Sequence, residues 1–339
     1  MPSLVGSEMC IRDSGWDAYG TWTFNSNFPN GFTTENNLAT GMGAGIGAWL
    51  GPVGGYGQSG TYRRKYWNNR GGMQLSNQDY YNYFVNCCNN MIKQYDFRFF
   101  KFDGISAQGT AYGPDAGDTG IENAEAIISI ERDVRKTRPD IFYNTTVGTW
   151  ASPFWFHYSD AIWRQDADCS KISNTGTDRE QWITYRDYMV YKIFTQGSPL
   201  CPINTLMTHG LILSKKGKPY TPSDYSYDGC GSGMVELYTD YSLMDEIKDN
   251  SGKAGALWKD LADCMEWQER NADVLPDIHW VGGNPWDGSK VNPYGWAAWN
   301  GKKTTLTLRN PDVNERTLTT TLRKVFDIPA SLQTTITLS

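Results

Sequence analysis

The middle of the chain alternates short apolar runs with amphipathic segments. Between residues 44 and 240, each run leads into a loop rich in Gly and Pro and then into a helix-like pattern. Continuous apolar runs of this length are typical of parallel strands that are covered by helices. The expected strands are residues 44–50, 97–102, 140–146, 160–164, 199–207 and 233–238. The pattern therefore predicts βα units arranged around a parallel sheet.

Helices are predicted between these runs, and two of them have recognisable starts. The predicted helices cover residues 119–137, 178–195 and 255–273. Thr119 and Glu122 have the spacing of a capping box at the start of the first helix. Thr177 and Glu180 have the same spacing at the start of the second. These signals predict where the two helices begin.

The number of units predicts an eight-stranded barrel. Six strand-helix units are two short of a (β/α)8 TIM barrel, and two units missing at the N-terminal end would complete it. After about residue 275 the chain changes to short alternating segments, namely HWVGG, YGWAAW, TTLTLRN and KVFDIP, which are typical of antiparallel strands. We therefore predict an N-terminally truncated α/β barrel over residues 15–274, followed by an incomplete antiparallel β-sandwich domain over residues 275–339.

The first residues differ in character from the rest of the chain. The opening VGSEMCIRDS resembles translated sequencing-adapter read-through, so residues 1–14 are predicted to be non-native. No signal peptide is visible. The domain sequence enters at GWDAYGTW, and the last segment, TLRKVFDIPASLQTTITLS, is strand-like. The chain is therefore expected to be a fragment.

Composition narrows the classes of function. The 339 residues carry a formal net charge of −6 and no basic run, which argues against a nucleic-acid surface. No stretch reaches about 18 consecutive apolar residues, so no membrane span is predicted. The seven cysteines show neither CxxC pairs nor zinc spacing, so no metal is expected. Aromatic residues make up 14% of the chain, which suits a cleft that stacks on sugars and equally suits an aromatic core.

Two aspartates end predicted strands at a suggestive separation. Asp103 closes the run FRFFKFD, and Asp168 follows the run that ends at Arg164. Their separation of 168 − 103 = 65 residues places them two units apart, since a barrel unit takes about 31 residues. Both would face the cleft at the C-terminal ends of the strands, where a retaining glycosidase needs a pair of carboxylates. Alternatively, each aspartate caps a loop or pairs with Arg164.

Two motifs resemble the catalytic motifs of the α-galactosidase superfamily, glycoside hydrolase clan D, in particular families 27 and 36. These motifs are FFKFDG and WRQDAD. The resemblance implies that Asp103 is the nucleophile and Asp168 the acid/base. It also implies that Lys101 binds a sugar hydroxyl and that Arg164 contacts the sugar. A lysine beside Asp103 keeps that carboxylate ionised. Asp166 competes with Asp168 for the acid role.

Weaker matches extend this resemblance along most of the chain. DSGWD resembles the family's DDGW motif after strand two, which implies sugar contacts for Trp16 and Asp17. NFPNGF and GAGIGAWLGP resemble the segment that leads into strand three. Trp49, Trp150 and Trp155 stand where loops leave the predicted barrel, and they are equally open to sugar stacking and to core packing.

The chain also departs from the family pattern. The cysteine-rich loops of family 27 are absent, and INTLMTHG replaces that family's Trp-Asn-Asp-Pro-Asp motif after strand seven. His209 in this segment either lines the cleft or is a structural group. The resemblance is therefore to a divergent bacterial branch of the superfamily.

The resemblance implies a retaining exo-α-glycosidase that hydrolyses terminal α-linked galactosides by double displacement without a cofactor. The alternatives are an α-N-acetylgalactosaminidase or another clan D α-glycosidase, and a non-catalytic carbohydrate-binding protein. Retention of both Asp103 and Asp168 counts against the non-catalytic alternative. The expected partner is an oligosaccharide or glycoconjugate substrate. Secretion or export to the periplasm is favoured, because acidic, aromatic-rich glycosidases are commonly exported.

Overall fold

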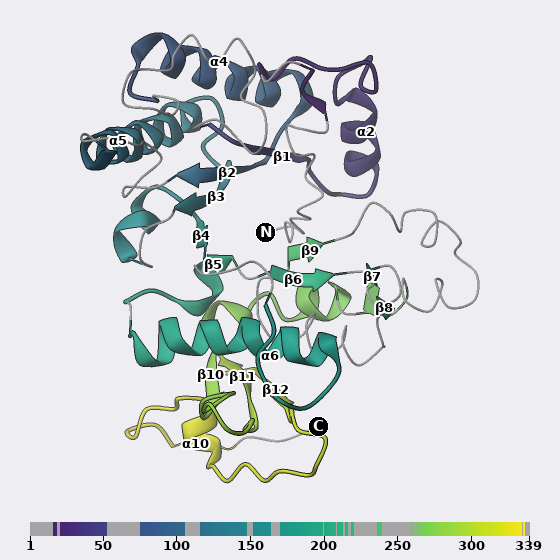
Figure 1. Cartoon of the computed structure of the whole chain (residues 1–339), viewed down its shortest axis with the longest axis vertical. Helices are drawn as coiled ribbons and strands as arrows, with labels where there is room; N and C mark the ends of the chain where they lie inside the picture. The colour runs from purple at the N-terminus through teal and green to yellow at the C-terminus, as the bar shows by residue number, and fades with distance from the viewer. Residues whose placement is uncertain are drawn as a thin grey trace. The chain divides into compact units, whose positions relative to one another are not determined.

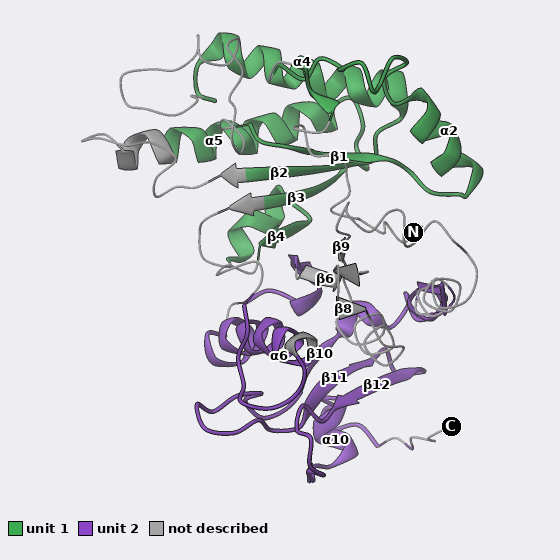
Figure 2. Cartoon of the chain, turned by 45° about the vertical axis from the view of Figure 1, so that its right-hand side comes forward, with its two compact units in different colours: residues 1–165 green, residues 166–339 purple. Residues whose placement is uncertain are grey.

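The computed structural model divides the chain into two compact units, unit 1 (residues 1–165) and unit 2 (residues 166–339) (Figure 2). The described residues are 16–18, 21–52, 75–105, 116–147, 152–163, 170–198, 200–207, 209–212, 214–215, 218–219, 236–238, 259, 262–263, 265–333 and 335. The segment predicted to be non-native, residues 1–14, lies outside them. The predicted domain boundary near residue 275 stays a prediction.

Unit 1 is built on a parallel sheet (Figure 1). Its strands are β1 (Gly47–Leu50), β2 (Phe99–Ile105), β3 (Phe142–Val147) and β4 (Ala161–Trp163). They lie side by side in sequence order, and each neighbouring pair is parallel. The first four strands predicted from apolar runs are thereby confirmed, with ends that differ by a few residues. The closed eight-stranded barrel stays a prediction.

Two long helices lie along one face of this sheet (Figures 1 and 2). The helices of unit 1 are α2 (Thr33–Gly41), α4 (Gln78–Tyr95), α5 (Ala116–Arg135) and the 3-10 helix η1 (Pro153–His157). Figures 1 and 2 show α4 and α5 side by side along the sheet. The prediction that Thr119 caps the start of α5 is wrong, because α5 begins at Ala116 and the backbone is already helical at Thr119. A capping box acts only where the chain enters a helix.

Aromatic side chains form the layer between helices and sheet. The Phe84 ring of α4 lies 5.3 Å from the Phe102 ring of β2, and Phe102 lies 5.4 Å from Tyr143 of β3. Phe100 and Phe102 are both fully buried, and their rings stack at 5.7 Å. Because side chains alternate along a strand, Lys101 and Asp103 face the opposite side of the sheet from these rings. The aromatic layer therefore decides which face of β2 carries the charged pair.

Unit 2 contains a three-stranded antiparallel sheet in the order β10-β11-β12 (Figure 1). These strands are β10 (His279–Gly282), β11 (Tyr294–Trp299) and β12 (Thr304–Arg309), and they confirm three of the predicted C-terminal strands. The Asn300-Gly301 turn joins β11 to β12, with Gly301 at φ +89°. That conformation is strained for any residue with a Cβ, which explains the glycine.

Helices pack on both faces of this sheet. The helix α6 (Asp178–Val190) continues into a π-helix, η2 (Tyr191–Gln196), and Val190 packs with Trp296 and Ala298 of β11. On the other face, Val281 and Ala297 pack with residues around α10 (Leu322–Val325).

The strand predicted for KVFDIP is wrong, since α10 and a turn occupy this segment. Thr321 caps the helix through the N–H of Lys324, and this places Val325, Phe326 and Ile328 against the sheet. Tertiary packing overrides the strand propensity of this stretch.

The remaining elements of unit 2 are short. They are η3 (Ile203–Thr205), β5 (Leu206–Met207), β6 (His209–Ile212), β7 (Ser214–Lys215), β8 (Lys218–Pro219), β9 (Glu236–Tyr238) and η5 (Leu275–Asp277). Among the described residues of the strand predicted over 199–207, only β5 is extended, and η3 precedes it as a 3-10 turn. The strand predicted over 233–238 is confirmed for β9. Residues 265–270 are helical, within the helix predicted over 255–273.

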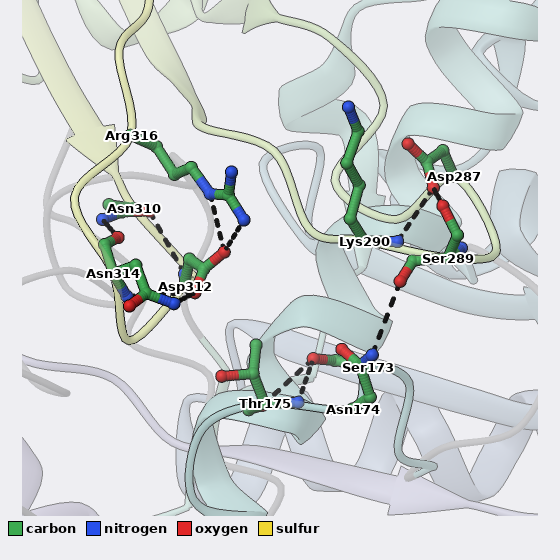
Figure 3. A network of polar contacts seen from close by, with 10 residues as sticks. All are labelled: Ser173, Asn174, Thr175, Asp287, Ser289, Lys290, Asn310, Asp312, Asn314 and Arg316. Carbon is green, nitrogen blue, oxygen red and sulfur yellow. Dashed lines mark hydrogen bonds and ion pairs between the residues drawn. The ribbon is translucent and has the colours of Figure 1, made fainter.

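Two loops of unit 2 are each held by one carboxylate (Figure 3). Asp287 accepts hydrogen bonds from the backbone N–H groups of Ser289 and Lys290, both at 2.9 Å. Asp312 accepts from the N–H of Asn314 at 3.0 Å and from Arg316. The N–H of Lys290 is the main cause that holds the pKa of Asp287 well below its ordinary value. Both carboxylates shape turns, as aspartates in loops commonly do.

Replacing Thr177 with alanine is expected to lower the free energy of unfolding by about 1 kcal/mol. Thr177 Oγ1 accepts from the N–H of Glu180 at 3.3 Å, and Glu180 Oε2 accepts from the N–H of Thr177 at 2.6 Å, which confirms the predicted capping box. Urea unfolding measures the change. Thr317→Ala, the same change at an exposed loop position, is the control and should alter stability by under about 0.5 kcal/mol. Equal effects of the two substitutions would contradict a capping contribution.

Candidate active site

The candidate site lies on the face of the unit 1 sheet that is opposite to α4 and α5. Lys101 and Asp103 both point to this face from β2 and are 3% and 7% exposed, so both charges are held out of bulk water. Register places Trp49 of β1 and Asn144 of β3 on either side of Lys101. Neighbouring strands are about 4.8 Å apart, so these three side chains form a row across the sheet.

The two charged residues on β2, Lys101 and Asp103, are both buried. A buried carboxylate or ammonium is costly unless an opposite charge or hydrogen-bond partners offset its lost hydration. The Cα atoms of Lys101 and Asp103 are about 6.6 Å apart along the strand, and the register of β2 against β3 shifts between Phe102 and Ile105. Asp103 is thus a buried carboxyl group near the C-terminal end of β2.

The tryptophans expected at the site are all buried where the structure describes them. Trp49 is 3% exposed and stands in register with Lys101. Trp16 is fully buried, and its ring lies 5.2 Å from that of Phe24. Trp155 is buried in η1, next to Phe154. These contacts are core packing, and sugar contacts by Trp16 and Trp49 stay predictions.

The polar residues expected at the site are only partly described. Asp17 accepts hydrogen bonds from the N–H groups of Thr21 at 3.1 Å and Thr23 at 3.2 Å, so it organises a turn. His209 begins β6, and its backbone pairs with Glu236 of β9. Trp150, Arg164, Asp166 and Asp168 lie outside the described residues. The structure therefore brings together Lys101, Asp103 and Trp49 of the predicted set, and the other assignments stay predictions.

Asn144 is a site residue that the sequence reasoning missed. It is 3% exposed, and its Oδ1 has no hydrogen-bond partner. Its signal in the sequence is an amide inside the apolar run IFYNTT, as Lys101 lies inside FRFFKF.

A second missed residue, Glu131 of α5, lies buried on the helix-covered face. Thr145 donates its hydroxyl to Glu131 Oε1 at 2.5 Å, and Ser159 donates to Oε2 at 3.0 Å. Burial raises the pKa of Glu131 from 4.5 to about 7, against the opposing effect of these two hydroxyl groups. This cluster links α5 to β3 and to the turn before β4, and it holds β3 in place behind the site.

The free energy of unfolding of the wild type should fall by about 3 kcal/mol as the pH rises from 4.5 to 7, when it is measured against that of the variant Glu131→Gln at each pH. In this window the folded chain keeps the proton of Glu131, whereas the unfolded chain has lost it. The folded state therefore binds more protons, and its stability decreases as the pH rises. Urea unfolding of both proteins across the window gives the difference.

The control for this pH dependence is Glu125→Gln, the same substitution at an exposed position of α5. Its stability difference from the wild type should stay constant across the window. If the stability difference between the wild type and Glu131→Gln is also constant across these pH values, Glu131 does not hold a proton in the folded state.

Two further searches cover only the described part of the chain. No group of three or more His, Cys, Asp or Glu side chains there has the geometry to hold a metal ion. Among the same residues, no helix has the length and apolar character needed to cross a membrane.

Comparison with known proteins gives structural likeness only. No protein-family model and no curated protein sequence matches the chain. A GH36 α-galactosidase from Geobacillus stearothermophilus, solved with raffinose, is similar with a TM-score of 0.55 and 14% identity over 86% of this chain and 41% of that chain. An α-galactosidase from Lactobacillus brevis has a TM-score of 0.58 and 10% identity over 83% of this chain and 37% of that chain.

An α-amylase from Geobacillus thermoleovorans, solved with acarbose, is also similar, with a TM-score of 0.50 and 10% identity over 83% of this chain and 69% of that chain. This chain spans about two fifths of the length of the α-galactosidases above. At these identities the likeness shows the fold. The resemblance to clan D α-galactosidases that the motifs predicted is confirmed at that level.

Proposed function

We propose that this chain carries the catalytic centre of a retaining exo-α-glycosidase that acts on terminal α-linked galactosides. The observation that carries the proposal is the burial of Lys101 and Asp103 together on β2, near the C-terminal end of that strand. The fold likeness to GH36 α-galactosidases supports it. Two of the similar structures hold raffinose and stachyose, which favours an oligosaccharide as the substrate.

In this proposal the site lies in a (β/α)8 barrel over residues 15–274, followed by a β-sandwich domain. The carboxylate of Asp103 attacks the anomeric carbon, and Asp168 donates its proton to the leaving oxygen as the glycosidic bond breaks. A covalent glycosyl ester on Asp103 results. Asp168 then takes a proton from water, the water oxygen attacks the anomeric carbon, and the ester bond breaks. Two inversions retain the α configuration.

The other residues bind the sugar in this scheme. Lys101 donates a hydrogen bond to a sugar hydroxyl, and its charge keeps Asp103 ionised between turnovers. Arg164 contacts the sugar beside the acid/base. The aromatic faces of Trp49 and Trp150 stack on the ring. No cofactor enters any step, since both proton transfers use the carboxyl group of Asp168.

Hydrolysis of a panel of nitrophenyl α- and β-glycosides tests the function. We expect release of nitrophenol from the α-galactoside, with the corresponding β-galactoside as the inactive control. Proton NMR of the first product formed should show the α anomer. A β anomer would overturn the retaining mechanism. No cleavage of any α-glycoside together with measurable galactose binding would favour a non-catalytic carbohydrate-binding protein.

A further inference from the structure

Asn144 presents a buried acceptor to the face that carries Lys101 and Asp103. Tyr143 and Thr145, its neighbours on β3, both hydrogen-bond to Glu131 on the helix-covered face. Strand alternation therefore turns Asn144 to the other face. Register places it directly beside Lys101 on one side and Ala161 of β4 on the other.

The amide oxygen of Asn144 accepts no hydrogen bond from the groups around it. It is inaccessible to water, because the residue is 3% exposed, and it has no hydrogen-bond partner. Buried polar oxygens are nearly always paired, so an unpaired one calls for an explanation. Ala161 has no side-chain donor, and the hydroxyl of Thr145 is engaged by Glu131 on the opposite face. A donor supplied by a ligand is consistent with this arrangement.

Lys101 complements Asn144 chemically. A lysine ammonium only donates hydrogen bonds, whereas the amide oxygen of asparagine only accepts them. The two residues are directly paired on strands about 4.8 Å apart, so one group of a ligand can reach both. A hydroxyl is the sugar group that accepts from one partner and donates to the other.

We propose that Lys101 and Asn144 form a donor–acceptor pair that recognises one hydroxyl of the terminal sugar. This inference rests on the proposed glycosidase function and assigns a binding role to Asn144. The pair lies about 6.6 Å down the strands from Asp103, which attacks C1. The hydroxyl next to C1 is therefore too close to Asp103, and the recognised group is the hydroxyl at C3, C4 or C6.

Nitrophenyl α-galactosides with fluorine in place of the hydroxyl at C3, C4 or C6 test this pair. Fluorine can accept weakly from Lys101 but has no proton to donate to Asn144. For wild type and Asn144→Ala, kcat/KM is measured on each analogue relative to the parent galactoside. The penalty at a position is the factor by which fluorine lowers kcat/KM relative to the parent galactoside. At one position, the penalty for the wild type should exceed the penalty for Asn144→Ala by about 10-fold or more. At the other two positions, the penalties should agree.

The matched control is Asn89→Ala on α4. Asn89 also has a side-chain oxygen without a hydrogen-bond partner, but it lies in α4, on the side of the sheet away from Lys101. Its fluorine penalties should equal those of the wild type at all three positions. If Asn144→Ala does not fold, Asn144→Val, which leaves a smaller void and has no side-chain acceptor, carries the same expectation.

Two failures are distinguishable. If the wild type cleaves the parent galactoside but Asn144→Ala shows wild-type penalties at every position, the pair is overturned and the proposed function stands. If the wild type cleaves no parent α-galactoside, the proposed function falls and the pair falls with it.

Discussion

Replacing Asp103 with alanine is expected to lower kcat on nitrophenyl α-galactoside by about 10⁴-fold or more. The variant has no carboxylate to attack the anomeric carbon, so the first displacement is lost. Added azide should restore turnover, because the anion fits the space left by the carboxylate and attacks from the same side. The product should then be the β-galactosyl azide, with inverted configuration.

The control for this loss is Asp140→Ala. Asp140 is 78% exposed and precedes the N-terminal end of β3, at the opposite end of the strands from the proposed cleft. Its activity should match the wild type. Thermal unfolding should show that Asp103→Ala is folded, since only then does the loss report on chemistry. Activity in Asp103→Ala without azide within about 10-fold of the wild type would remove Asp103 as the nucleophile.

Replacing Asp187 with alanine is expected to lower the free energy of unfolding by about 3–5 kcal/mol. Asp187 and Arg186 are both fully buried in α6, and Arg186 donates to Asp187 Oδ1 at 2.9 Å. Tyr294 of β11 donates its hydroxyl to Oδ2 at 2.6 Å, and it accepts from Arg309 at 2.6 Å. Removal of Asp187 would leave the Arg186 charge buried without its carboxylate.

Urea unfolding followed by circular dichroism measures this loss, with Asp263→Ala as the matched control. Asp263 pairs with Lys259 at the surface, where their side chains are 55% and 73% exposed. Exposed pairs of this spacing contribute under about 1 kcal/mol. A loss at Asp187 no larger than at Asp263 would contradict the argument, since it would mean that Arg186 regains hydration without the carboxylate.

Local signals in the sequence predicted the main elements of unit 1. The apolar runs are long enough, and placed regularly enough, that β1 to β4 can be located without a structure. The capping box at Thr177 in unit 2 is similarly local, because the hydrogen bonds involved span only a few residues. The motif FFKFDG identified Lys101 and Asp103 as candidate site residues.

Tertiary structure decided which side chains meet. Register alone sets Asn144 beside Lys101, and register depends on how two strands 43 residues apart (144 − 101) align. The cluster of Glu131, Thr145 and Ser159 likewise joins three separate segments.

In α10, tertiary packing also overrides what the local sequence predicts. Its segment has strand-like residues, yet packing on Val281 and Ala297 favours a helix and turn. Local patterns record the preferences of a few neighbouring residues, whereas partners across strands and layers are chosen by packing and hydrogen bonding over the whole unit.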